Sequence, residues 1–227
     1  MNFENCPSHQ MPRLQIPDPE THTARRSRPA RDHELVQIVD AAFADAARRS
    51  GEWLVCHPGC SQCCIGVFAI NALDAIRLRE GLAKLAQTDP ARAAQVQQRA
   101  RASLSRIAAD FPGDIKTGIL SDSKRAQRRF EGFGNDEPCP ALDPETGTCD
   151  LYAHRPITCR VFGPPVRSED GLGVCELCYH GATDVEIAAC EMTPDPQDLE
   201  SRVLSEIAPT NRNSGRTIVA FCLARDV

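Results

Sequence analysis

Apolar residues recur at the spacing of an α-helix in four separate stretches of the chain. The first stretch begins after Asp32 and repeats an apolar side chain every three or four residues as far as Ala46. This period places the apolar side chains on one face, which predicts an amphipathic helix packed against a core. Asp32 stands at the start of the pattern, where a short polar side chain can cap the first turn.

Three further helices are predicted by the same reasoning. One follows Asn71, which can act as its cap, one spans about 90 to 110 until Pro112 and Gly113 end it, and one lies near 195–207. Their apolar positions are Leu73, Ile76, Leu82 and Leu85, then Val96, Leu104, Ile107 and Phe111, then Leu199, Val203, Leu204 and Ile207. Together these helices are expected to form the hydrophobic body.

Shorter elements are expected between and after these helices. Residues 121–131 predict a helix with Ser121 available as a cap, and its run of lysines and arginines is typical of a solvated face. Residues 143–147 place Pro144 and Gly147 at the positions of a tight turn, which predicts a small hairpin. The apolar run at 217–223 is expected to form a terminal strand.

Composition bounds the size and setting of the fold. Residues 1–30 contain five prolines and no apolar periodicity, which predicts a disordered tail before a single globular domain at 31–227. The formal net charge of −5 makes nucleic acid an unlikely default partner. No apolar run reaches the roughly 18 residues of a spanning helix, and no secretory leader is visible. We therefore expect a cytoplasmic protein with no membrane segment.

The twelve cysteines are the strongest chemical signal in the sequence. Because reducing cytosol disfavours structural disulfides, clustered cysteines there indicate metal ligation or redox chemistry. Nine of them fall into three groups, which are Cys56, Cys60, Cys63 and Cys64, then Cys139, Cys149 and Cys159, then Cys175 and Cys178. Cys6, Cys190 and Cys222 stand apart and are expected to be free thiols.

Spacing within these groups suits a four-coordinate metal ion. Two cysteines separated by two residues can reach one ion from a tight turn, and both Cys60–Cys63 and Cys175–Cys178 have that spacing. The Pro-Gly pair ahead of Cys60 favours a turn that folds Cys56 back toward the same place.

The remaining cysteines have plausible routes to the same neighbourhood. The predicted hairpin would bring Cys139 close to Cys149, and Cys159 follows an Arg-Pro pair near the start of a short helix, where a thiolate is favoured. Four thiolates around a divalent cation leave about two excess negative charges, which Arg155 and Arg160 could offset.

Three segments of the chain carry a family resemblance. They are Cys60-Ser-Gln-Cys-Cys64, Cys139-Pro-Ala-Leu142, and residues 147–162, with the sequence GTCDLYAHRPITCRVF. Over roughly residues 56–178 the chain resembles the CxxCxxCC family of zinc- or iron-chelating domains, also called YkgJ-like cysteine-cluster proteins. The motif that names the family has two residues between its first cysteines, whereas three separate Cys56 from Cys60 here.

Motif and grouping together predict a metal-binding protein that chelates zinc or iron, with an iron–sulfur cluster as a further form of the cofactor. The predicted ligands are Cys56, Cys60, Cys63, Cys64, Cys139, Cys149, Cys159 and Cys175. The resemblance implies an alternative, an iron–sulfur enzyme of redox or protein lysine methylase-like activity. The sequence holds no nucleotide fingerprint, phosphate loop, HExxH or serine nucleophile motif, so catalysis rests on the resemblance alone.

Other residues near the cysteines receive structural interpretations. His57, His154 and His180 could complete a Cys3His site, but loop histidines are common, so ligation by thiolates is preferred. Tyr152 and Phe162 are expected to give the cysteine-rich segment hydrophobic cover. The predicted fold class is α+β, mainly α, in which a helical body carries an irregular cysteine-rich knot and a small hairpin. A protein partner is compatible with this picture.

Overall fold

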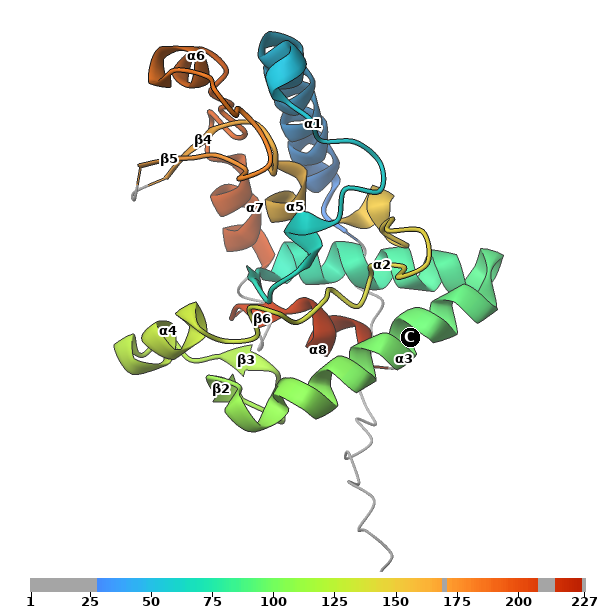
Figure 1. Ribbon diagram of the computed structural model, residues 1–227. Helices are drawn as coiled ribbons and strands as arrows, with labels where there is room; N and C mark the ends of the chain where they lie inside the picture. The colour runs from blue at the N-terminus through green and yellow to red at the C-terminus, as the bar shows by residue number, and fades with distance from the viewer. Residues whose placement is uncertain (1–27, 169–170, 208–214, 226–227) are drawn as a thin grey trace, which may run out of the picture.

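The structure, a computed structural model, describes residues 28–168, 171–207 and 215–225. Of the tail predicted for residues 1–30, residues 1–27 lie outside these ranges. Helices dominate the described part of the chain, and its strands occur as short antiparallel pairs (Figure 1). The predicted fold class, α+β and mainly α, is therefore confirmed.

The body is built on a helical hairpin of α2 (Ala72–Thr88) and α3 (Pro90–Ile107). Asn71 caps α2 as predicted, since its side chain accepts a hydrogen bond of 3.0 Å from the amide of Asp74. Asp89 caps α3 in the same way through the amide of Arg92, also at 3.0 Å. Only Asp89 separates the end of α2 from the start of α3, so the chain reverses sharply and the two helices pack side by side.

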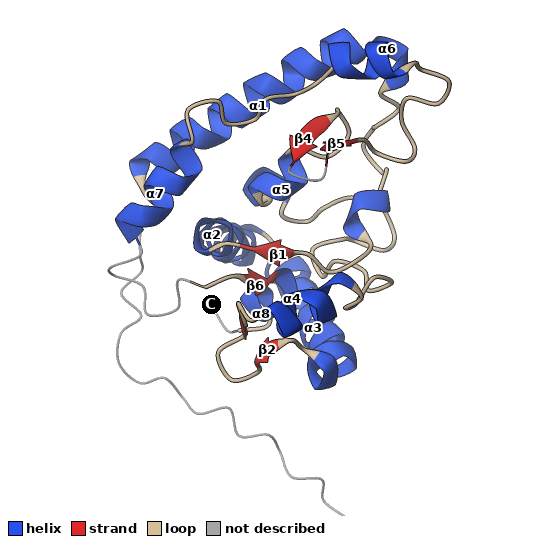
Figure 2. Cartoon of the chain, turned by 90° about the vertical axis from the view of Figure 1, so that its left-hand side faces the viewer, coloured by secondary structure: helices blue, strands red, loops and turns tan. Residues whose placement is uncertain are grey.

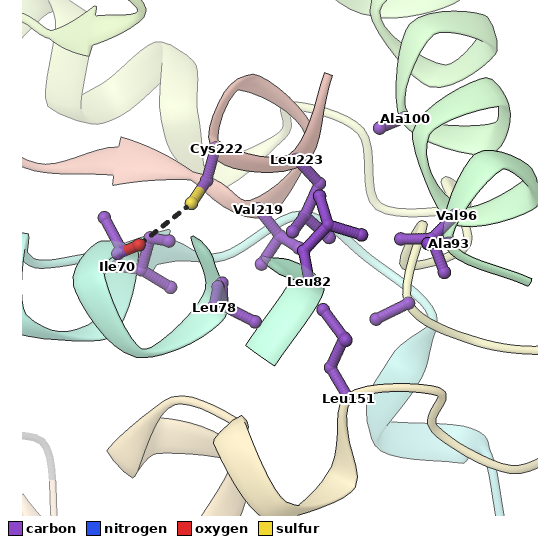
Figure 3. Packing of buried hydrophobic residues seen from close by; sticks show 12 residues of the cluster. Ile70, Leu78, Leu82, Ala93, Val96, Ala100, Leu151, Val219, Cys222 and Leu223 are labelled. Atoms are coloured by element: carbon purple, nitrogen blue, oxygen red, sulfur yellow. Dashed lines mark hydrogen bonds between the residues drawn. The ribbon is translucent and has the colours of Figure 1, made fainter. Parts of the chain in front are cut away.

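A short helix from the far end of the chain fills the groove of this hairpin. Residues 217–223, predicted to be a strand, are a strand only at β6 (Thr217–Ile218) and then form α8 (Val219–Leu223). The prediction of a seven-residue strand is wrong because a fully apolar run does not distinguish a buried strand from a buried helix by period. Figure 3 shows Leu82, Leu151 and Leu223 within the resulting core.

The strands form three pairs of two. β1 (Ala69–Ile70) pairs with β6, β2 (Gly113–Asp114) pairs with β3 (Ile119–Leu120), and β4 (Val166–Ser168) pairs with β5 (Gly171–Gly173). In the first pair Ala69 lies opposite Ile218, which ties the C-terminal segment to the start of α2. Beside the second pair, α4 (Lys124–Glu131) is capped by Ser123, two residues after the predicted Ser121.

A second cluster of apolar residues packs α1 (Ala30–Ser50) against α7 (Leu199–Ile207) and α5 (Ile157–Arg160) (Figure 2). Leu35, Val39 and Val203 are fully buried in it. The remaining helix, α6 (Asp184–Ala189), begins with a capping box between Thr183 and Glu186 and lies near the end of α1. The helices predicted at 32–46 and 195–207 are therefore present.

A buried ionic network joins these parts. The prediction that Asp32 caps α1 is wrong. Asp32 is a buried residue of the first turn and is paired with Arg77 of α2. Arg77 also pairs with Asp74, whose carboxylate accepts a hydrogen bond of 2.9 Å from the amide of Ile157. Arg28 approaches Asp32 from the other side. The network thus connects α1, α2 and the start of α5, the helix that carries Cys159.

Substitution of Arg77 tests this network. Arg77→Met leaves Asp74 buried without its cation and Asp32 paired with Arg28 alone, which is expected to lower the free energy of unfolding by about 3–5 kcal/mol. The matched control is Arg31→Met, because Arg31 pairs with Glu206 on the surface, where such a pair contributes about 0–1 kcal/mol. Urea denaturation at fixed metal content measures both, and equal effects would refute the assignment.

Candidate metal centre

The first cysteine group lies on consecutive tight turns after α1. The amide of Cys60 donates to the carbonyl of His57 at 3.0 Å, and the amide of Cys64 donates to that of Ser61 at 2.8 Å. Gly59 and Gly66 have φ of 94° and 100°, a conformation that other residues adopt only with strain. The sequence can therefore reverse direction twice within ten residues and present several thiols from one compact loop.

The second group is fastened directly to this loop. The amide of Cys139 donates to the carbonyl of Cys64 at 2.7 Å, and Ile65 and Pro138 form an antiparallel bridge. The predicted hairpin is present in minimal form, with Leu142 opposite Cys149 and Gly147 at φ 68° in its turn. Two groups separated by more than 70 residues in the sequence therefore meet through backbone contacts.

Helix α3 clamps the second group from the other side. The carboxylate of Asp150, 1% exposed, is paired with both Arg92 and Arg99. Arg99 also donates to the carbonyl of Pro140 at 2.9 Å, and Arg106 pairs with Glu137 at 2.6 Å. The polar face of α3 thus holds residues 137–150 in place by charge, which the spacing of cysteines could not reveal.

Four thiols gather where these segments meet. Cys139 and Cys149 pack against the core of α2, α3 and α8, and burial, followed by the neighbouring thiol of Cys149, raises the pKa of Cys139 to about 12. Burial also raises the pKa of Cys159, and the next causes are Cys139 and Cys149. Cys63 makes a smaller contribution that raises the pKa of Cys139, Cys149 and Cys159. We call Cys63, Cys139, Cys149 and Cys159 the inner set.

Cys64 lies beside the inner set. Its thiol is hydrogen-bonded to that of Cys63, and this bond, with burial, raises the pKa of Cys63 well above its usual range. Adjacent cysteines project in different directions, so Cys64 supplies a further donor next to the inner set rather than a copy of Cys63.

A second gathering of thiols lines a small cavity nearer the surface. This cavity, of about 20 Å³, is bounded by Cys56, Cys60, Cys63, Cys175 and Cys178 and by apolar side chains. Burial raises the pKa of Cys56, with smaller contributions from Cys60, Cys63 and Cys175. Cys178 is not among the eight predicted ligands. It lies here because its amide donates to the carbonyl of Cys175 at 2.9 Å, which closes a tight turn between the two cysteines. We call Cys56, Cys60, Cys175 and Cys178 the outer set.

The donor set suits a thiophilic ion, although the sulfurs do not surround a common point. In the described ranges no three His, Cys, Asp or Glu side chains stand in the geometry of a metal site. Several thiols are instead hydrogen-bonded to one another, as Cys56 is to Cys60 and Cys63 to Cys64. Ligation would replace the thiol protons by the ion and requires the cysteine side chains to reorient.

Of the two arginines expected to offset thiolate charge, one lies in position. Arg155 lowers the pKa of both Cys63 and Cys149, against the larger effects of burial and neighbouring thiols, and its guanidinium lies 3.9 Å from the centre of the Tyr152 ring. Arg160 is buried and binds Asp40 at 2.8 Å and the carbonyl of Ala153 at 2.7 Å. The prediction for Arg160 is therefore wrong, because its charge is already paired within the body.

The expected aromatic cover comes from one of the two predicted side chains. Phe162, 39% exposed, lines the cysteine cavity, whereas Tyr152 is 64% exposed and the neighbouring Leu151 is buried instead. The hydrophobic cover of the inner set comes instead from the helical body, since Ala141 and Leu151 join the core of α2 and α3. Leu151 lies inward just before the 3-10 turn Tyr152–His154, whereas Tyr152 at the start of that turn lies outward, which composition alone does not show.

The three histidines near the cysteines have other surroundings. His57 and His180 are exposed, and His57 contacts the carbonyl of Pro58. His154 packs over Gly81 of α2 and lies 3.4 Å from the amine of Lys84. The preference for thiolate ligands over a mixed site is consistent with this placement.

A family comparison agrees with the geometry. Residues 55–179 match the model of the CxxCxxCC family, described as a "putative zinc- or iron-chelating domain". The chain belongs to the CxxCxxCC family. The match covers more than half of the 227 residues and includes both the inner and the outer set, so the resemblance seen in the motifs is confirmed. No curated protein and no solved structure matched the chain.

Across the three described ranges, no helix combines the length and apolar character that a membrane span needs.

Differences in exposure predict an order of thiol reactivity. In metal-free protein, Cys56 is exposed and is expected to react first with iodoacetamide, while Cys139 and the buried Cys222 react last. Peptide mapping by mass spectrometry after timed quenching gives the rate at each cysteine. Modification of Cys139 as fast as Cys56 would mean that the inner set is open to solvent, contrary to the structure.

Proposed function

We propose that this protein binds zinc or iron through cysteine thiolates and that the inner set is its primary centre. The observation that carries the proposal is the backbone bond between Cys139 and Cys64, which holds the two cysteine-rich segments 56–64 and 139–149 in contact. Membership of the CxxCxxCC family supports the choice of metals. The eight ligands proposed for the chain are Cys56, Cys60, Cys63, Cys64, Cys139, Cys149, Cys159 and Cys175.

The surroundings of the inner set favour a bound cation over free thiols. A single thiol at the edge of a hydrophobic core can pack as a small apolar side chain, but four thiols from three separate segments together supply the donor set of a thiophilic ion. Mutual repulsion and burial both disfavour thiolates there in the absence of metal. A divalent ion reverses that balance, since it neutralises two charges and satisfies all four sulfurs at once.

The metal in this account consolidates a segment that the body has already shaped. The ion pairs of α3 and the bond from Ile157 to Asp74 hold the backbone near Cys149 and Cys159. Metal ligation then adds to the stability of the segment, in an amount smaller than the roughly 10–16 kcal/mol measured when ligation drives the whole folding of a small zinc peptide. A closed four-thiolate centre of this kind is structural or sensory rather than hydrolytic, because it leaves no open coordination position.

The setting proposed for the protein is the reducing cytoplasm. Each of the eleven cysteines in the described ranges is a free thiol, including neighbours such as Cys56 and Cys60 that lie within hydrogen-bonding distance. Thiols so close together would form disulfides in an oxidising compartment.

Metal analysis after anaerobic purification tests the proposal. The wild-type protein is expected to retain zinc or iron, and Cys149→Ser is expected to lose the ion of the inner set while far-ultraviolet circular dichroism still shows a helical fold. The matched control is Cys222→Ser, since Cys222 is also buried and only donates to the carbonyl of Ala75 at 3.3 Å. Wild-type protein that retains neither zinc nor iron, or Cys149→Ser with undiminished metal, would contradict the proposal.

The same preparation separates a simple ion from a cluster. Colourless protein with zinc and no acid-labile sulfide would identify a mononuclear thiolate site. A brown protein with stoichiometric sulfide would identify an iron–sulfur cluster, and it would favour the alternative of an iron–sulfur enzyme.

A further inference from the structure

The inner and outer sets lie in different hydrophobic surroundings. Cys139 and Cys149 pack on the core of α2, α3 and α8. Cys175 and Cys178 belong to a separate cluster, which contains Trp53, Leu54, Val174, Tyr179, Ala182, Ile187 and Cys190. Two supporting clusters for two groups of sulfurs indicate two separate sites rather than one enlarged site.

The outer set encloses a cavity of suitable size and chemistry. Its volume of about 20 Å³ exceeds the roughly 10–15 Å³ that one water-sized particle needs, and five cysteines line it. Cys63, the fifth, lies between the two sets, since it interacts with Cys56 as well as with Cys139, Cys149 and Cys159. With Cys63 assigned to the inner set, the cavity still has the four sulfurs of the outer set.

The turn that carries Cys175 and Cys178 is held in a strained form. Tyr179, directly after Cys178, has φ of 61°, which is unfavourable for a bulky residue. Its amide donates to the carbonyl of Trp53 at 2.9 Å, and its hydroxyl lies 2.5 Å from that of Ser50 at the end of α1. Such strain is typical of ligand clamps, where the surrounding structure fixes a geometry that the chain alone would avoid.

A second loop faces this turn across the cavity. Cys56 and Cys60 lie on either side of the turn at Gly59, where the amide of Cys60 donates to the carbonyl of His57. Each loop contributes two sulfurs, and α1 positions both, because the 3-10 turn Gly51–Trp53 leads into one and Trp53 anchors the other. This arrangement of two loops with paired cysteines matches the needs of a tetrahedral thiolate site.

From these observations we infer that Cys56, Cys60, Cys175 and Cys178 form a second metal site, distinct from the inner set, which takes a zinc-like divalent ion. The inference rests on the thiolate chemistry proposed above. It assigns three of the ligands proposed there, Cys56, Cys60 and Cys175, to a separate centre and adds Cys178. The rim of the site is open, since Val55, Phe162 and Leu177 are 51%, 39% and 42% exposed and Cys56 itself is exposed. Its ion is therefore accessible to chelators through this rim.

Zinc stoichiometry tests the second site. Anaerobic protein is loaded with zinc ions, and native mass spectrometry counts the metal on each chain. The wild type is expected to hold one ion more than Cys175→Ser/Cys178→Ser, and a colorimetric chelator should remove that ion in a fast phase that the double variant lacks. Cys56→Ser, a change at an exposed position, should lose the same fast phase.

Two controls make failure informative. Cys190→Ser alters a buried cysteine in the same apolar cluster as Cys178, so it reports any loss caused by disturbed packing, and it is expected to retain every ion. Equal metal content in the wild type and the double variant would overturn the second site and leave the inner centre intact. A wild type that binds no metal would overturn both proposals, and loss of an ion from Cys190→Ser as well would overturn the assignment of the outer ligands.

Discussion

The buried pairing of Arg77 with Asp32 and Asp74 is the interaction on which the arrangement of the site depends. A guanidinium and two carboxylates so deeply buried can exist only together, because any one of them alone would carry the full cost of desolvation. The network therefore fixes α1 on α2, and through the bond from Ile157 to Asp74 it fixes α5 on both. This geometry positions Cys159 on α5, and the end of α1 positions the cysteines near residue 56.

Charge serves the same purpose on the opposite face of the body. Asp150, between Arg92 and Arg99, holds the minimal hairpin on α3, and the backbone of Cys139 is bonded to that of Cys64. The cysteine-rich segment is thus built against a preformed helical body and not around its metal. Metal binding then involves loss of thiol protons and rotation of side chains, which separates the chemistry of the site from the folding of most of the chain.

The sequence predicted those features that depend on local pattern and missed those that depend on burial. Helical period and the Asn71 cap were visible because both are local, and the motifs around Cys60, Cys139 and Cys159 identified the family. The local pattern favours Asp32 as a cap, since its buried partner Arg77 lies 45 residues away in the sequence. The inward turn of Arg160, the exposure of Tyr152 and the division of the cysteines into two sets are likewise tertiary properties. Only the CxxC spacing pointed to Cys178.

The central claim is that sulfurs from distant segments of this chain share a metal ion, and X-ray absorption at the edge of the bound metal tests it most directly. For protein purified without oxygen, the account predicts a first coordination shell of sulfur alone, at about 2.3 Å if the ion is zinc. A shell dominated by nitrogen and oxygen at about 2.0–2.2 Å would contradict it, since the clustered cysteines would then not be the ligands.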